Sequence, residues 1–272
     1  MYERINARLI EQPPQDAAAP PIHLHPLASV CKGCRVGSLC LPTGLPEQDN
    51  GRFSALIGQR IRVRKGCGLY HANDPLQYLY AIRFGSFKTS LTNAEGQGLV
   101  INFWMPGDVM GLDAISTNRH VCDAIALEDS EVCPIPYQRL EALAREFPFL
   151  QQSLNRLLSR EIVREHERVL MICNLTAEER LASFLVGLSR RFVNRGYSAH
   201  GFVLRMSRED IASYLGLRLE TVCRGIAHLR QLEIVRLRGR VVEILDLPAL
   251  MALEHGYGKS RSRSAYARPA ED

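Results

Sequence analysis

Short runs of alternating apolar and polar residues fill the chain from about residue 61 to residue 137. Examples are IRVRKG, LYAIRFGSFKTSL, LVINFWMPGD and DAIALEDSEVCPIPY, and glycines separate these runs. Alternation with period two places every second side chain on one face of a strand, and glycine suits the turns between strands. No helical run separates the strands, which disfavours a parallel sheet. The pattern therefore predicts an antiparallel barrel or roll.

The pattern changes near Leu140, where glycines disappear and apolar residues adopt helical spacing. A short helix is expected to end near Pro148, and a long helix follows. Along the long helix, four apolar residues and one acid recur at alternating spacings of four and three, which is the seam of a two-stranded coiled coil. They are Leu158, Ile162, Glu165, Val169 and Ile172. This face could instead pack on the chain's own roll, but the helix length and the acid favour a homodimer that repulsion keeps weak.

Residues 207–229, SREDIASYLGLRLETVCRGIAHL, predict two short helices joined by a tight turn. Ser207 and Asp210 have the spacing of a helix-capping pair, and Gly216 supplies the positive φ that the turn needs. Apolar residues of both helices have the spacing of an inward face. They are Ile211, Ala212, Leu215, Val222, Ile226 and Leu229. This layout is typical of a helix-turn-helix, whose second helix enters the major groove of DNA.

The outward face of the second helix offers Glu220, Cys223 and Arg224. Arginine can bond guanine bidentately and glutamate can accept from the cytosine amino group, so Glu220 and Arg224 together could read a G·C pair. The next segment, EIVRLRGRVVEIL, predicts a basic hairpin that lies along phosphates as a wing. A helix pair without nucleic acid accounts for fewer of these features. The candidate DNA contacts are Ser207, Arg218, Glu220, Thr221, Cys223, Arg224, Arg238 and Arg240.

Composition adds the cellular setting and the candidate chemistry. The 272 residues are 46% hydrophobic and 23% charged, and they contain neither a run of about 20 apolar residues nor a secretion signal. A cytoplasmic protein without a membrane partner is therefore expected, and the net charge of +5 is a weak indication of polyanionic partners. The histidines fall in separate segments with no nucleophile or carboxylate at meaningful spacing, so an enzyme is not expected.

Three cysteines lie close together in the stretch VCKGCRVGSLCLP, at positions 31, 34 and 40. In a reducing compartment such a cluster indicates metal or redox chemistry in preference to a disulfide framework. Zinc and iron-sulfur clusters both normally take four ligands, and no second CxxC pair exists here. Among the remaining cysteines, Cys67, Cys122 and Cys133 lie in the expected roll and are the candidates for the fourth ligand.

These features together resemble the CRP/FNR superfamily, and within it the FNR type of oxygen-responsive fumarate and nitrate reductase regulators. The motifs are CKGCRVGSLCLP, PGDVMGLDAI, EVCPIPY, NLTAEERLASFLVGLSRRF and DIASYLGLRLETVCR, and the resemblance covers about residues 31–250. It implies an α+β fold with an N-terminal cyclic-nucleotide-binding-like β-roll, a long dimerisation helix and a C-terminal winged helix-turn-helix. The expected segments are a flexible arm at 1–29, a cysteine-rich segment at 30–45, the roll at 46–148, the dimerisation helix at 149–173, the DNA-binding domain at 174–252 and a basic flexible tail at 253–272.

The resemblance implies a 4Fe-4S cluster whose fourth ligand lies in a VCxIP strand segment. The implied ligands are Cys31, Cys34, Cys40 and Cys133, with Cys122 as the rival fourth ligand. The intact cluster would favour dimers that bind TTGAT-N4-ATCAA-like sites and control anaerobic gene expression, and oxygen, with nitric oxide as a further candidate signal, would release them. Cys223 stands where the family's ExxSR pattern has serine, so relaxed preference at one base is expected. RNA polymerase is a further implied partner, for which TNAEGQG at 92–98 is either the contact loop or an ordinary hairpin tip.

The alternative is a cyclic-nucleotide-responsive regulator whose cysteine segment binds zinc or nothing. The CRP-like nucleotide pocket needs a glutamate for the ribose and an arginine for the phosphate. Leu112 takes the place of the glutamate here, and Val121-Cys122 takes the place of Arg-Ser. Arg119 could be a displaced phosphate ligand, but without the glutamate a cyclic nucleotide is not expected.

Overall fold

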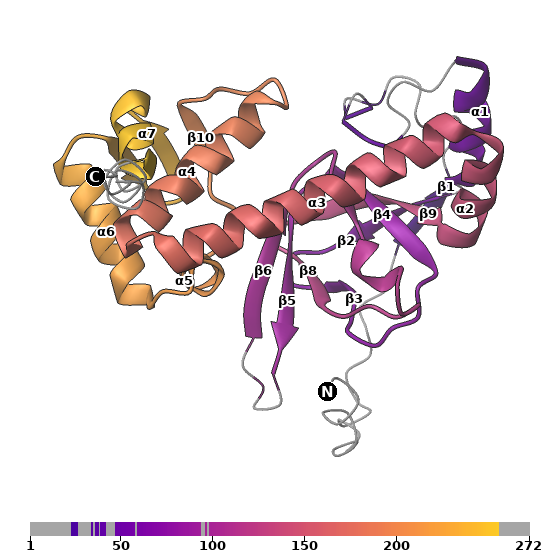
Figure 1. Ribbon diagram of the computed structural model, residues 1–272, viewed down its shortest axis with the longest axis horizontal. Helices are drawn as coiled ribbons and strands as arrows, with labels where there is room; N and C mark the ends of the chain where they lie inside the picture. The colour runs from indigo at the N-terminus through magenta and orange to yellow at the C-terminus, as the bar shows by residue number, and fades with distance from the viewer. Residues whose placement is uncertain are drawn as a thin grey trace, which may run out of the picture.

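The computed structural model describes residues 23–26, 34, 36–37, 39–41, 47–57, 59–93, 96 and 98–255. Two antiparallel sheets form a roll in the N-terminal half (Figure 1). The first has the strand order β1-β2-β9-β4-β7, and the second has the order β3-β8-β5-β6. The strands are β1 His23–Pro26, β2 Gln59–Val63, β3 Gly68–Tyr70, β4 Tyr78–Phe84, β5 Phe87–Thr92, β6 Gly98–Trp104, β7 Val109–Met110, β8 Asp123–Ala126 and β9 Ser130–Pro136. Their antiparallel pairing confirms the predicted roll.

The two faces of the first sheet bury different clusters of apolar side chains. Leu79 on β4 and Ile135 on β9 pack with residues of the helices that cover this sheet. Ile82 on β4 packs with Phe87 on β5 inside the roll. Because strand side chains alternate between faces, the period-two pattern of the sequence supplies both clusters at once.

Among the residues that the structure describes, three helices and a short 3-10 helix accompany the roll. They are α1 Glu47–Leu56, η1 Leu112–Ala114, α2 Tyr137–Glu146 and α3 Pro148–Asn174. The short helix ends just before Pro148, as predicted, and Pro148 is the first residue of α3, where its missing N–H would have no helical partner anyway. Figure 1 shows α3 running from the roll to the C-terminal half of the molecule.

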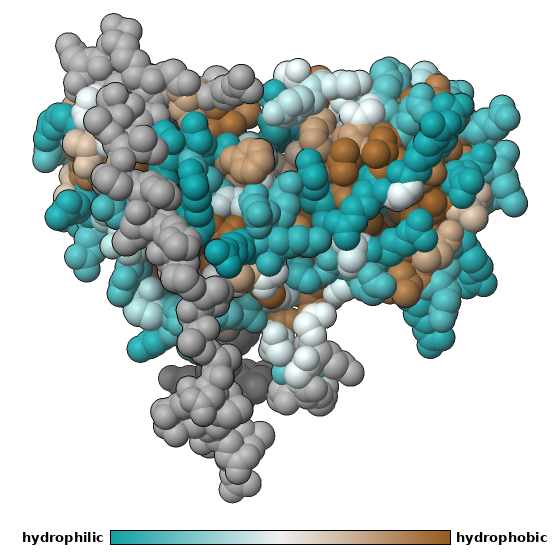
Figure 2. Space-filling model, turned by 180° about the vertical axis from the view of Figure 1, so that it is seen from behind, coloured by the Kyte–Doolittle hydropathy of each residue, from teal (hydrophilic) through white to brown (hydrophobic). Residues whose placement is uncertain are grey.

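The C-terminal half is a winged-helix unit built from four helices and a three-stranded sheet of order β10-β12-β11. Its elements are α4 Ala177–Val193, β10 Gly201–Val203, α5 Arg208–Leu215, α6 Leu219–Gln231, β11 Val235–Arg238, β12 Val241–Ile244 and α7 Leu247–His255. The predicted helix pair and basic hairpin are confirmed as α5, α6 and β11–β12. Seen from behind, the surface is largely hydrophilic, with hydrophobic side chains gathered mainly over the winged-helix half (Figure 2).

Two terminal segments of the expected organisation are described only in part. Within the expected arm, His23–Pro26 form β1, which lies antiparallel to β2 with His25 opposite Arg60. At the other end α7 reaches His255, three residues into the expected tail. The rest of the arm and the tail lies outside the described residues. No helix in the described part of the chain has the length and apolar character needed to cross a membrane.

Candidate nucleic-acid interface and cysteine site

The first helix of the helix-turn-helix is fixed at both ends by the residues predicted to do so. The Asp210 N–H donates to Ser207 Oγ at 3.1 Å, and the Ser207 N–H donates to Asp210 Oδ2 at 2.9 Å. Gly216 ends α5 with φ 63°, a left-handed conformation that a residue with a Cβ adopts at a cost. Both features are confirmed, and they set the angle at which α6 leaves the turn.

The second helix, α6, packs tightly on α4 and presents a polar face outward. Val222, Ile226 and Leu229 are buried, as predicted. A Cβ on Gly225 would lie only 2.9 Å from Leu181 Cδ2 on α4, so glycine permits the close contact between the two helices. The exposed residues of this helix and its N-cap include Arg218, Glu220 and Arg224.

A hollow of about 360 Å³ separates α5, α6 and the wing. It brings together three of the candidate contacts, Ser207, Cys223 and Arg240. Arg208, which the sequence reasoning missed, also lines the hollow, and its Nη1 lies 3.7 Å from Cys223 Sγ. Its position directly after the N-cap of α5 could have indicated this role, because that end of α5 faces the same hollow as α6.

The wing completes this basic surface. Gly239, with φ 61°, makes the tight turn between β11 and β12. Arg238 is exposed on one side of this turn and Arg240 on the other. Arg240 is also held by a bond from its Nη1 to the Arg205 carbonyl at 3.0 Å. Positive side chains thus border both the hollow and the outward face of α6, the arrangement needed to contact phosphates on either side of a base-reading helix.

Three of the four implied cluster ligands lie among the described residues, and Cys31 lies outside them. Cys34 and Cys40 are half-buried, and two turns connect them, with the Gly37 N–H bonded to the Cys34 carbonyl and the Cys40 N–H bonded to the Val36 carbonyl. Cys40 packs against the buried cluster that contains Cys133 of β9. Within the described residues, which leave out Cys31, no group of three or more metal-binding side chains comes together.

The rival ligand Cys122 belongs to a different part of the roll. It is buried in the cluster between the sheets, and its Sγ donates to Asp113 Oδ2 at 3.5 Å. Burial raises the pKa of the Cys122 thiol well above its usual range, and the Asp113 carboxylate raises it further. Beside it, the rings of Tyr70 and His120 stack at 3.8 Å. Cys122 is therefore a neutral, buried hydrogen-bond donor.

The segment where a nucleotide pocket was considered is occupied by contacts within the roll. Arg119 Nη1 donates to the Asn73 carbonyl at 2.6 Å. The Asp113 carboxylate accepts the Val121 N–H at 2.8 Å as well as the Cys122 thiol. Burial raises the pKa of Asp113, but the bonds from His120 and Val121 outweigh it, so the pKa lies below its usual value.

The five predicted seam residues of α3 divide into two groups. Ile162 and Val169 each have 56% of their surface exposed, and Glu165 is also exposed. Leu158 and Ile172 are half-buried, and Ile172 packs against the core of the winged-helix unit. The opposite face of α3 packs on the roll through Leu150, Leu154 and Leu157. The middle of the seam is thus left uncovered by the chain's own roll.

Comparisons with known proteins agree with this architecture. Residues 60–147 match the cyclic nucleotide-binding domain family, and residues 179–253 match the Crp-like helix-turn-helix domain family. The chain is 42% identical to the transcriptional regulatory protein btr of Bordetella pertussis over 85% of this chain and 96% of that protein. It is 40% identical to the fumarate and nitrate reduction regulatory protein of Vibrio cholerae over 82% of this chain and 89% of that protein. The solved structure of FixK2 from Bradyrhizobium japonicum superimposes with a TM-score of 0.67 at 30% identity, covering 72% of this chain and 96% of that one.

A β-roll joined by a long helix to a winged helix-turn-helix with a basic outer face defines a DNA-binding transcription regulator, and not an enzyme. The extent and identity of these matches place the chain in the CRP/FNR family. The resemblance and the α+β fold predicted from the sequence are confirmed.

Proposed function

We propose that this protein is an oxygen-responsive regulator of anaerobic gene expression, which holds a 4Fe-4S cluster and binds DNA as a homodimer. The similarity to a fumarate and nitrate reduction regulatory protein supports the biological role. The observation that carries the sensing part is the packing of Cys40 against the buried cluster that contains Cys133.

The donor set fits an iron-sulfur cluster. Cys31, Cys34, Cys40 and Cys133 would hold it, since thiolates are the usual ligands of such clusters, and a bound cluster supplies redox chemistry that oxygen can alter. The segment that carries Cys34 and Cys40 lies over buried apolar residues, which would limit access of water. Cys122 is a poorer candidate, because its thiol is bonded to Asp113 in another cluster of the roll.

The proposed DNA target is a TTGAT-N4-ATCAA-like site. Glu220 and Arg224 are exposed on α6 and would read a G·C pair in each half-site. Arg218, Thr221, Cys223 and the wing arginines would contact neighbouring bases and phosphates. A palindromic site requires a two-fold symmetric dimer, for which the exposed middle of the α3 seam is the proposed interface. RNA polymerase is the proposed partner of the hairpin tip at 92–98, and the cytoplasm is the proposed location.

Serine replacements of the two rival cysteines test the cluster assignment. Under anaerobic purification, Cys133→Ser should lose most of the iron and the visible absorbance, because one of four ligands is removed. Cys122→Ser should retain about four irons per chain and bleach in air as the unchanged protein does. Both cysteines are buried in the roll, so each variant places a serine hydroxyl in a buried site and serves as the control for the other.

Iron content and absorption spectra therefore decide between Cys133 and Cys122 as the fourth ligand, and between an iron-sulfur cluster and zinc. Retention of the cluster in Cys133→Ser would refute the ligand assignment. A colourless protein that contains zinc would refute oxygen sensing through iron and would favour the cyclic-nucleotide alternative.

A further inference from the structure

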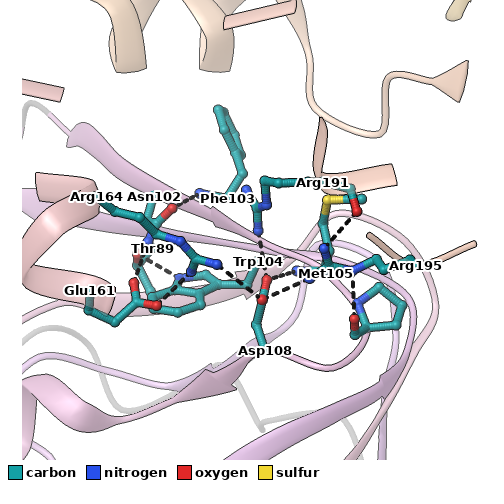
Figure 3. Close-up of polar contacts among 11 residues, drawn as sticks. Thr89, Asn102, Phe103, Trp104, Met105, Asp108, Glu161, Arg164, Arg191 and Arg195 are labelled. Carbon is teal, nitrogen blue, oxygen red and sulfur yellow. Dashed lines mark hydrogen bonds and ion pairs between the residues drawn. The ribbon is translucent and has the colours of Figure 1, made fainter. Parts of the chain in front are cut away.

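The turn between β6 and β7 ends in a carboxylate that gathers arginines from two helices (Figure 3). This carboxylate belongs to Asp108, and its Oδ2 accepts the Met105 N–H at 2.8 Å, which closes the turn. The same carboxylate also accepts bonds from Arg191 at 2.6 Å and from Arg195 at 2.8 Å, both near the end of α4. Arg164 of α3 lies 3.7 Å from it. One buried side chain thus joins the roll, the long helix and the winged-helix unit.

This carboxylate stays ionised in its buried position. Burial alone would raise the pKa of Asp108, but the charges of Arg191, Arg195 and Arg164 outweigh burial and hold the pKa below its usual value. The turn is clamped a second time, because Arg195 Nε donates to the Pro106 carbonyl at 2.7 Å. A buried charge that loses such partners is left uncompensated, so Arg191, Arg195 and the turn should keep their relative positions.

The cysteine-rich segment rests on the other side of this turn. Leu39, which precedes Cys40 directly, lies so close to Gly107 that a Cβ on Gly107 would be 2.7 Å from Leu39 Cβ. Gly107 also has φ 93°, so both the backbone and the space require glycine. A displacement of Leu39 therefore acts directly on the residue next to Asp108.

On the side of the winged-helix unit, the arginines and the recognition helix are joined by α4 itself. Arg191 lies near its C-terminal end, and Leu181 lies near its N-terminal end. Leu181 meets α6 at Gly225, where the spacing leaves no room for a larger residue. Contacts at van der Waals distance in packed interiors pass on displacements because there is no void to absorb them.

We infer that Asp108 is a positioning residue through which the cysteine-rich segment sets the placement of the DNA-reading helix. The order of contacts is as follows: Leu39 contacts Gly107, Asp108 contacts Arg191 of α4, and α4 contacts α6. The inference rests on the proposed function, because it takes the cysteine-rich segment as the sensing end.

A second set of contacts joins the two halves but does not include the cysteine-rich segment. Lys88 of β5 pairs with Asp210 at 2.5 Å, and the Val100 N–H of β6 donates to Ser213 Oγ at 2.9 Å. These contacts hold α5 against the second sheet, so they supply an attachment that remains when the Asp108 contacts are weakened. Variants at Asp108 should therefore change the placement of the unit without detaching it.

A double-mutant cycle between Leu39 and Asp108 tests the inference. Leu39→Ala alone should lower the DNA affinity of the anaerobic full-length protein by at least about fivefold, the lower end of usual allosteric couplings. In an Asp108→Asn background the same change should have less than about a twofold effect, because the connection is already broken. Hydrogen exchange along α4 and α6 should likewise respond to Leu39→Ala only when Asp108 is present.

Asp113→Asn is the matched control, since Asp113 also caps a backbone N–H in the roll but contacts no arginine among the described residues. The effect of Leu39→Ala should persist at full size in that background. If Asp108→Asn does not fold, Arg191→Gln replaces it in the cycle, because Arg195 and Arg164 then still compensate the carboxylate.

Additive effects of Leu39→Ala and Asp108→Asn would refute the inference, as would equal loss of coupling in the Asp113→Asn control. Iron content is measured in the same samples. Protein that contains iron but shows additive effects contradicts the positioning role alone. Protein without iron contradicts the proposed function. A non-additive cycle measured on that protein would still support the connection between the cysteine-rich segment and α6.

Discussion

At the residue scale, Cys223 is the position where the DNA-reading face departs from the family pattern. Its Sγ lies in the hollow between α5, α6 and the wing, near Arg208 Nη1. A thiol is a weak hydrogen-bond partner for a base, and a hydroxyl in its place adds a bond worth about 1 kcal/mol. Cys223→Ser should therefore raise the preference for the cognate base at one half-site position by about fivefold to tenfold.

Selection of binding sites from a randomised DNA pool, with the unchanged protein and Cys223→Ser in parallel, measures this preference. Cys173→Ser is the control, because Cys173 is exposed near the end of α3, away from the hollow. Full stringency at every position in the unchanged protein would contradict the prediction.

Single residues show what a sequence can and cannot reveal. The capping pair Ser207 and Asp210 could be predicted because both partners lie within one helical turn. The proposed ligand role of Cys133 rests on family resemblance, since spacing left Cys67, Cys122 and Cys133 as alternatives. The arginines around Asp108 lie at least 56 positions away in the sequence, at 164, 191 and 195, so no local pattern announces them.

At the element scale, the exposed middle of the α3 seam makes Glu165 a control point for association. Ile162 and Val169 on either side are more than half exposed, so a second copy would bury them together with Glu165. Glu165 pairs with the largely buried Arg168 at 3.3 Å, but the Glu165 carboxylate itself remains exposed to solvent, which weakens the attraction. Glu165→Leu should remove the repulsion and add apolar contact, which should tighten dimerisation by at least about tenfold, or about 1.4 kcal/mol.

Analytical ultracentrifugation of the iron-free protein measures the dimer dissociation constant. Glu167→Leu is the control, since Glu167 is exposed on the same helix but is outside the predicted seam. Equal association of the two variants would contradict the seam.

Two of the elements that escaped prediction are very short. The strand β10 has three residues and η1 also has three, too few for a period to be recognised. The pairing of β10 with β12 joins residues about 40 positions apart, and a sequence pattern contains no information about such partners. Longer elements such as α3 and β6 were predictable because their own spacing specifies which face is buried.

At the scale of the whole molecule, the roll and the winged-helix unit share one buried cluster. Phe103 of β6 contacts the rings of Phe184 on α4 and Tyr214 on α5. Val100 and Met105 of the roll belong to the same cluster. The sequence predicted the roll and the winged-helix unit as separate segments, because helical and strand periods are local. It did not predict the contact between them, because the apolar residues at that contact could equally have been buried within their own segment.

Lowering the pH should separate the contribution of Asp108 to the free energy of unfolding from that of the apolar contacts. Since its pKa is held below 3.8 in the folded protein, its stabilising effect is fully present above about pH 4 and is lost as the pH falls through that lower value. At pH 7, Asp108→Asn should lower the free energy of unfolding by roughly 3–5 kcal/mol, the usual cost of breaking a buried ion pair. The difference from the unchanged protein should begin to shrink below about pH 3.8, where Asp108 becomes neutral in the unfolded state, and it should be lost once the pH is below the lower pKa of the folded state.

The charged groups around Asp108 are Arg164 and Glu161 on α3, Arg191 on α4 and Arg195 just after α4, and all of them are present in both proteins. The comparison therefore isolates Asp108. The one tryptophan, Trp104, lies in the adjoining strand, so its fluorescence during urea unfolding at each pH reports on this region. A stability difference that persists unchanged at pH 3 would show that shape, and not charge, holds the two halves together at this turn.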